Sequence, residues 1–140
     1  MEEEKGLIKI LSLFLLESHF KRDSTIESIV APTTSILIDT KGGISPEGNK
    51  AFLELTIKTS KEEKIPFEAE IKMVGLFELI NIPTDQHANF LKVNAPAIVF
   101  PFIREHLASL TVKAGFQPVL INTVNFVQMA KDSEEPQPKN

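Results

Sequence analysis

The sequence predicts an α+β domain in which helices pack on one face of an antiparallel sheet. Segments with the composition and alternation of strands occupy residues 7–80, and helical segments follow them. Two of the strands are joined by a short charged turn over residues 61–64, as in an antiparallel hairpin. No internal repeat interrupts this order, and strands followed by helices are typical of the α+β class.

The chain has the size and composition of one folded domain. Its 140 residues are 42% hydrophobic and 24% charged, which is a globular balance. We expect the domain to span residues 1–131, followed by a disordered polar tail over residues 132–140 that is rich in proline and charge. The net charge of −4 argues against a nucleic-acid partner, because phosphate binding requires a basic face.

Cysteine is absent, which excludes disulfides, thiolate metal sites and cysteine nucleophiles. The sequence begins with MEEE, the opposite of the basic start of a signal peptide. No apolar run approaches the ~20 residues that span a bilayer. We therefore expect a soluble cytoplasmic protein with no membrane insertion.

The first segment, residues 7–22, is apolar on both faces in its middle. As a strand it needs cover on both sides, from its own domain and from a second subunit. A helix of the same composition is an alternative that periodicity does not exclude. Residues 23–34 then form a polar connection, residues 35–40 a short strand, and residues 41–50 a loop with Gly42 and Gly43 as turn formers.

The predicted hairpin consists of residues 51–60 and 65–80. Its first strand alternates cleanly, so that Leu53, Leu55 and Ile57 face the core. Gly75 interrupts the second strand and predicts a bulge or a close approach of another part of the chain. The inner face of that strand carries Phe67, Ala69, Ile71, Met73 and Phe77.

Helices complete the chain. Thr84 or Asp85 is expected to cap a short helix that ends near residue 92, and Asn94 is expected to cap the main helix. This main helix should become regular only after residue 100, because Pro101 lacks an N–H.

Gly115 is predicted to end the main helix. Residues 116–124 are extended and apolar. Asn125 then caps a final short helix over residues 126–130.

No arrangement of residues predicts catalysis. His19, His87 and His106 lie in three different elements, so no two of them share a face as metal ligands do. We expect His106 to be partly buried and the other two to be exposed. Glu68 and Glu70 share one strand face, which is better explained as a solvated surface than as an acid–base pair. The protein is therefore expected to be no enzyme and to need no metal or cofactor.

The aromatic composition favours binding of apolar material. The chain has ten Phe but no Trp and no Tyr, so its large apolar area lacks the polar groups that give ligand pockets their selectivity. Such a surface binds apolar chains with little chemical discrimination.

Two spaced segments, NAPAIVFPFIRE at residues 94–105 and GFQPVLIN with VNF at residues 115–126, together resemble segments of a known family, the SecB protein-export chaperones. Residues 94–105, NAPAIVFPFIRE, are similar to the family segment in which a proline precedes LFPYARE. Residues 115–122, GFQPVLIN, and residues 124–126, VNF, are similar to the segment G-F-P-L-L-P-VNF that follows the family's long helix. The resemblance covers residues 7–131 and is strongest over residues 94–126.

The resemblance implies a four-stranded antiparallel sheet with two main helices, assembled as a dimer of dimers. It also implies an ATP-independent holdase that keeps precursor polypeptides unfolded before export. Candidates for its client-binding groove come from the extended segment and the final helix; the alternative is that they form the core beneath the main helix. These candidates are Phe116, Val119, Leu120, Ile121, Val124, Phe126 and Met129. The candidates for a subunit-interface helix, again with core as the alternative, are Phe102, Ile103, Leu107 and Leu110.

The partner that receives the client is left open by the resemblance. Family members that deliver clients to the SecA motor dock it through an acidic patch, which here corresponds to Glu17, Lys21, Glu68 and Glu70. Lys21 replaces an acid, and Glu68 replaces an apolar residue. Residues 16–22, LESHFKR, are similar to SecB-like proteins outside the export pathway, some of which guard an antitoxin. An antitoxin or another single dedicated partner, and an oligomeric adaptor without holdase activity, are therefore the alternatives to export.

Overall fold

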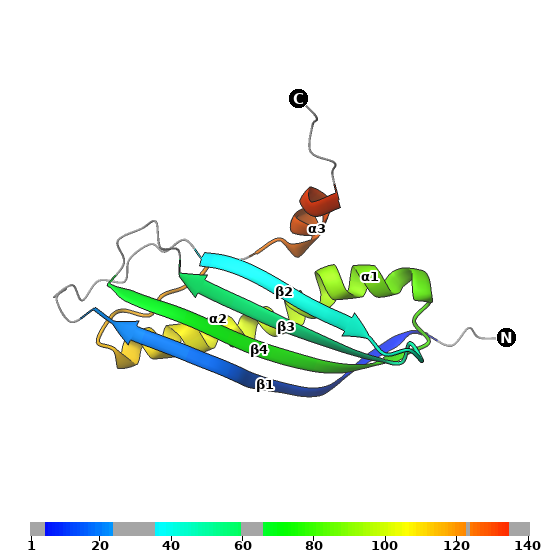
Figure 1. The fold of residues 1–140 in the computed structure, drawn as a ribbon, viewed down its shortest axis with the longest axis horizontal. Coiled ribbons are helices and arrows are strands. Elements are labelled where there is room, and N and C mark those ends of the chain that lie inside the picture. Colours follow the sequence, from blue (N-terminus) through cyan, green and yellow to red (C-terminus); the bar gives the residue numbers. More distant parts are fainter. Residues whose placement is uncertain (1–4, 24–35, 60–65, 123, 135–140) are drawn as a thin grey trace, which may run out of the picture.

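The computed structural model describes residues 5–23, 36–59, 66–122 and 124–134. The predicted charged turn at 61–64 lies outside these residues, as does the predicted connection at 23–34 after Asp23. Of the predicted tail at 132–140, residues 132–134 are described and belong to a helix, and the rest lies outside. Four strands form one antiparallel sheet in the order β1-β4-β3-β2 (Figure 1). The strands are β1 (Leu7–Arg22), β2 (Ile36–Ile44), β3 (Lys50–Thr59) and β4 (Phe67–Ile80).

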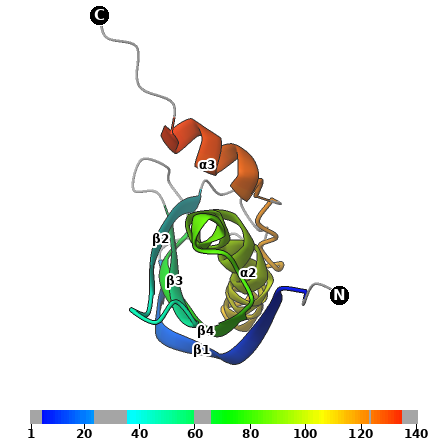
Figure 2. The same ribbon diagram turned by 90° about the vertical axis from the view of Figure 1, so that its right-hand side faces the viewer.

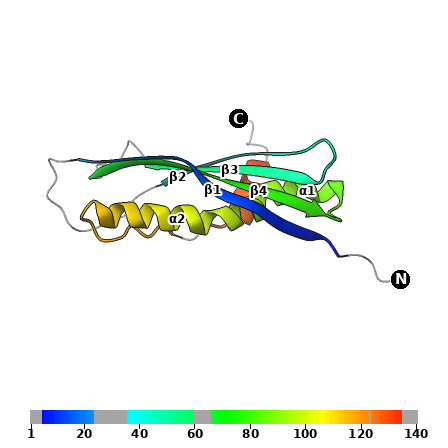
Figure 3. The same ribbon diagram turned by 90° about the horizontal axis from the view of Figure 1, so that it is seen from below.

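The fold has two layers. The long helix α2 (Ala95–Lys113) lies along one face of the sheet (Figure 3), and the sheet curls around it when viewed along the helix (Figure 2). The short helix α3 (Phe126–Glu134) stands clear of the sheet at its β2 side. The predicted α+β class with a four-stranded antiparallel sheet is confirmed.

The hairpin β3–β4 follows the predicted alternation. Leu53, Leu55 and Ile57 are almost fully buried, and their register partners on β4 include Met73 and Ile71. Gly75 lies where α2 approaches the sheet closely: a Cβ atom there would come within 2.6 Å of the Phe77 ring and 3.1 Å of Val99. The close-approach interpretation of this glycine is therefore correct.

Strand β1 departs from a simple alternation. Its register against β4 shifts between Ile10 and Ser12 and again between Leu15 and Glu17, so that one extra residue is inserted at each place. Each insertion reverses the side to which the following residues point. This explains why odd-numbered and even-numbered positions are both apolar at the centre of β1. Residues 7–22 therefore form a strand, and the alternative of a helix is wrong.

Strand β2 is longer than predicted. It continues through Gly42 and Gly43 to Ile44, and the turn is confined to residues 45–49, with Gly48 at a φ of 77°. The prediction of a loop from residue 41 is wrong because the two glycines permit close packing instead of turning the chain. A Cβ atom on Gly42 would lie 3.1 Å from Leu91, and one on Gly43 would lie 2.9 Å from the Phe52 ring.

The helical region is continuous from Thr84 to Lys113. A 3-10 turn (Thr84–Gln86), the short α1 (His87–Asn89) and a π-helical segment (Phe90–Asn94) lead directly into α2. The first turn is preceded by Pro83, so Thr84 and Asp85 lie inside it and are not its N-cap. Asn94 has helical dihedrals and forms no side-chain cap bond. The separation into two helices was wrong because the wider π turn, in which the Ala95 N–H bonds to the Phe90 carbonyl, accommodates a proline at position 96. Helix α2 also includes Pro101 without a break.

The end of α2 and the start of α3 lie where the sequence predicts them. Gly115 has a φ of 90°, and the N–H groups of Gly115 and Phe116 bond to the carbonyls of Val112 and Thr111, which is a Schellman motif. Asn125 caps α3, because its Oδ1 accepts a hydrogen bond of 3.0 Å from the Gln128 N–H. Helix α3 continues to Glu134, four residues past its predicted end.

Candidate functional site

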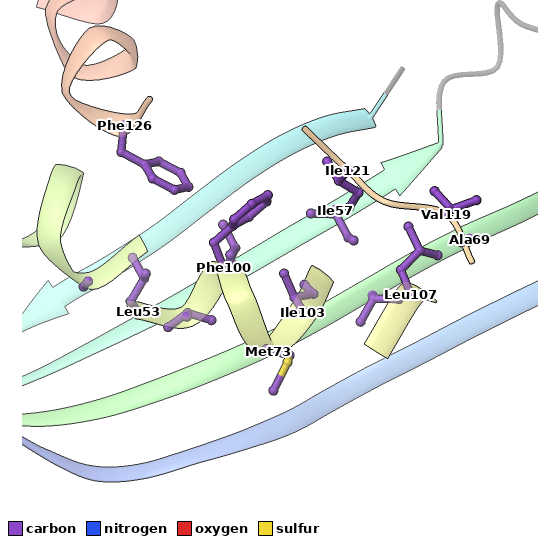
Figure 4. Packing of buried hydrophobic residues seen from close by; sticks show 14 of the residues in the cluster. Leu53, Ile57, Ala69, Met73, Phe100, Ile103, Leu107, Val119, Ile121 and Phe126 are labelled. Carbon is purple, nitrogen blue, oxygen red and sulfur yellow. The ribbon is translucent and has the colours of Figure 1, made fainter. Parts of the chain in front are cut away.

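The extended segment after α2 covers the inner face of the sheet; we call residues 116–122 the strap. Four of the seven predicted groove residues belong to the hydrophobic core of the single chain: Phe116, Val119, Ile121 and Phe126. Val124 is half-buried against this core. Leu120 and Met129 remain exposed, with 67% and 40% of their surface accessible. Figure 4 shows side chains of α2, the sheet and the strap meeting in this core.

A buried hydroxyl ties the strap to α2. Thr111 is fully buried, and its Oγ1 donates to the Ala108 carbonyl at 2.8 Å. The same oxygen accepts a 3.0 Å hydrogen bond from the Val119 N–H. At the far end, the Phe126 ring meets the edge of the Phe100 ring at 5.8 Å between centroids. Both contacts are therefore with α2: one holds Val119 within the strap, and the other holds Phe126 just beyond its end.

An aromatic cluster lies under the start of the strap. Phe20 stacks on Phe67 with 5.2 Å between ring centroids, and Phe67 meets Phe116 at 6.0 Å. The Arg22 guanidinium lies over the Phe116 ring, 4.6 Å from its centroid, and donates a hydrogen bond to the Ala114 carbonyl. Sequence reasoning missed Phe20 and Arg22. Phe20 and Arg22 are two residues apart on a strand, so they lie on one face. This spacing is the signal from which they could have been predicted.

The predicted interface helix divides between core and surface. Ile103 and Leu107 are fully buried against the chain's own sheet, so the core interpretation is the correct one for these two. Phe102 is 50% exposed and Leu110 is half-buried. Exposed Val112 lies on the outer side of the helix and was not among the candidates.

Strand β1 carries several exposed apolar side chains. It is an edge strand of the sheet, and Ile10, Leu15 and Leu16 are 54%, 44% and 54% exposed. Strand and helix are joined there by a hydrogen bond of 2.9 Å between Ser18 Oγ and His106 Nε2. We call Ile10, Leu15 and Leu16 of β1, together with Phe102 of α2, the β1 surface. An apolar edge strand of this length is normally paired or covered in a stable protein.

The predicted acidic patch is on the sheet face opposite α2. Glu17, Glu68 and Glu70 do share this face, but each has basic or imidazole neighbours across the strands. Lys72 Nζ lies 3.7 Å from Glu17 Oε2. Glu68 is opposite a lysine, Lys21, and Glu70 lies between His19 and Lys58. The patch is therefore balanced in charge.

The histidines occupy unrelated places. His19 is exposed and His106 is half-buried, as predicted. His87 is half-buried as well, with its Nε2 3.1 Å from the Ile82 carbonyl oxygen, so the prediction that it is a surface residue was wrong. Among the described residues, no three of the His, Asp and Glu side chains are placed to hold a metal ion. No helix in the described ranges is long and apolar enough to cross a membrane.

Known proteins resemble this chain in sequence and in fold. The family described as preprotein translocase subunit SecB matches residues 3–137. Protein-export protein SecB of Rickettsia felis is 34% identical over 123 residues, covering 79% of this chain and 81% of the relative. The corresponding protein of Rickettsia typhi is 33% identical over the same lengths.

Two solved structures share the fold at low sequence identity. A SecB-like chaperone of Mycobacterium tuberculosis, in complex with a ChAD peptide from the HigA1 antitoxin, superposes with a TM-score of 0.62 at 12% identity, covering 84% of this chain and 88% of the other. A protein of unknown function from Streptococcus agalactiae gives a TM-score of 0.51 at 10% identity, covering 86% of this chain and all of the other. The match over residues 3–137, the relatives above 30% identity and the shared fold establish that the chain belongs to the SecB family.

Proposed function

We propose that the protein is an ATP-independent chaperone that binds unfolded precursor polypeptides in the cytoplasm and holds them for export. The observation that carries this proposal is the 34% identity to protein-export SecB proteins over most of both chains. The described residues also carry large exposed apolar side chains on β1, α2 and α3, which suit the binding of apolar segments.

Weak contacts are sufficient for such a function. Burying one Val, Leu, Ile, Phe or Met side chain is worth about 1.5–3 kcal/mol before ordering costs, so two or three anchors give reversible binding. Several copies of the site in one assembly raise the avidity without nucleotide hydrolysis. We propose a homo-oligomer, a dimer of dimers, in which the β1 surface is a subunit contact. A binding role of this kind requires no catalytic residue.

A dedicated partner is the second candidate, and the charge of the sheet favours it. Glu17, Glu68 and Glu70 are each beside a cationic or imidazole side chain, so the face opposite α2 lacks the net negative charge that would attract a basic docking segment. In this alternative the protein is a SecB-like chaperone that protects one antitoxin or another single client, and it does not dock SecA.

The holdase proposal can be tested by diluting a denatured precursor into buffer with and without the protein and following aggregation by light scattering. We expect suppression at near-stoichiometric amounts, with no effect of added ATP. An equal mass of an unrelated folded protein is the control. Aggregation at an unchanged rate would reject the holdase function. Adding purified SecA to the client complex then separates the candidates, since only the export function predicts a stable ternary complex.

A further inference from the structure

Arg22 connects three parts of the fold that are distant in sequence. It is the last residue of β1, where its register partner is Phe67, and it therefore points to the same side of the sheet as this buried aromatic residue. The backbone here is fixed, because the Asp23 N–H bonds to the Pro66 carbonyl at 2.8 Å. From this fixed strand end, the guanidinium reaches the C-terminus of α2 and the first residue of the strap.

The contact with α2 uses a carbonyl that the helix leaves available. The Schellman motif at Gly115 occupies the carbonyls of Thr111 and Val112. The carbonyl of Ala114, the C-cap residue of α2, accepts a hydrogen bond from Arg22 Nη1. Carbonyls at a helix C-terminus carry partial negative charge, so a guanidinium is a favourable partner.

The contact with the strap depends on Gly115 and Phe116. A Cβ atom at position 115 would lie 2.9 Å from Arg22 Nη1, so the glycine leaves room for the guanidinium as well as permitting the positive φ. The guanidinium then lies over the ring of Phe116, which is 5% exposed. One side chain thus holds both the helix end and the first strap residue.

Beneath this contact is the aromatic cluster of Phe20, Phe67 and Phe116. The strap belongs to no helix or strand, in contrast to the sheet residues under it. When its start lifts away from the sheet, the faces of Phe67 and Phe116 become accessible. They would offer a flat apolar site for an aromatic or aliphatic side chain.

We propose that Arg22 is a positioning residue for client binding: it latches the start of the strap over the aromatic cluster and so sets how often this cluster is open to a client. This inference rests on the proposed chaperone function. Apparent affinity for a site that is open only part of the time is reduced by the open fraction. Loosening the latch therefore strengthens client binding, whereas loss of a merely structural contact weakens binding together with stability.

The test compares Arg22→Gln with Lys21→Gln, which makes the same charge change one residue earlier on the exposed, opposite face of β1. Amide hydrogen exchange at Phe116 and Val119 should accelerate about tenfold in the Arg22 variant and stay unchanged in the Lys21 variant. The Kd for a labelled unfolded peptide with Phe and Leu anchors should fall by about threefold to tenfold in the Arg22 variant alone. Arg22→Lys, which keeps the charge but lacks the planar stacking group, should give intermediate values and serves if the Gln variant does not fold.

Each outcome is decisive. Faster exchange of the strap with tighter peptide binding supports the latch. Unchanged exchange in both Arg22 variants, or faster exchange with equal or weaker binding, overturns it while leaving the chaperone function intact. A wild-type protein that binds no unfolded peptide would instead overturn the proposed function, and with it the role of the latch in client binding.

Discussion

At the scale of single residues, Thr111 is the polar side chain on which the strap depends. It is fully buried, and its hydroxyl donates to one backbone group of α2 and accepts from one of the strap. A buried donor or acceptor that loses its partner retains the full cost of its desolvation. Removing the hydroxyl should therefore lower the stability of the fold by more than the net energy of one hydrogen bond.

Thr111→Val should lower the free energy of unfolding by about 1–3 kcal/mol, because the Val119 N–H is left buried without an acceptor. Chemical denaturation followed by circular dichroism measures this loss. Thr111→Ser, which keeps the hydroxyl and removes only a methyl group, is the control and should lose less. Equal losses in the two variants would show that packing, and not the hydrogen bond, is what Thr111 provides.

Residue-level interpretation from sequence succeeded where one local signal was sufficient. Gly115 and Asn125 were identified as helix-end residues because a positive φ and an N-cap side chain each have a local signature. It failed where the deciding contact was distant. Gly42 and Gly43 suggested a turn, but the side chains that require them to be glycine, Leu91 and Phe52, are placed by the tertiary fold.

At the scale of elements, α3 depends on its first turn. Phe126 at its start packs on Phe100, while Val127 and Met129 farther along are 48% and 40% exposed. An isolated helix of this length is marginal in water. Its stability therefore depends on the Asn125 cap and on the packing of Phe126 into the core, where α3 contacts Phe100 and the π-helical segment.

Asn125→Ala should unfold part of α3 and leave the sheet unchanged, because removing an Asn cap costs about 1 kcal/mol. Amide exchange over residues 126–134 should accelerate while that of β3 and β4 stays as in the wild type. Asn122→Ala changes an exposed asparagine outside any helix and serves as the matched control. If both variants exchange alike, the 3.0 Å bond from Gln128 to Asn125 does not hold the helix.

The two insertions in β1 show why the facing of a strand's residues cannot always be predicted from its own sequence. Strict alternation in β3 made its inner face predictable, residue by residue. In β1 the parity reverses at each register shift, and these shifts become visible only once β4 provides a register. The same limit applied to the candidate site. The apolar strap was located correctly, but whether Phe116 and Ile121 line a groove or fill the core depends on packing against α2 and the sheet.

At the scale of the whole molecule, the two faces of the sheet differ in what they can meet. The face opposite α2 has opposite charges on neighbouring strands at Glu17 and Lys72, and at Glu68 and Lys21. Such balance gives little attraction for a charged partner at this part of the face. Exposed Phe14, Phe52 and Leu76 make another part of the same face apolar. The β1 surface is apolar and lies at an edge of the sheet. A charged substitution there should therefore disrupt subunit assembly, whereas one on β2 should not.

Ile10→Glu tests this difference, because Ile10 is 54% exposed in the single chain and its replacement leaves the core intact. In an assembly that covers β1, the carboxylate would be buried without a partner at a cost of several kcal/mol, and the oligomer should dissociate to smaller species. Leu37→Glu places the same charge on β2 at a position that is 50% exposed, and it should keep the wild-type mass. Light scattering on the purified variants at micromolar concentration measures both. A folded Ile10→Glu variant with the wild-type mass would exclude the β1 surface as a subunit contact and leave it available to clients.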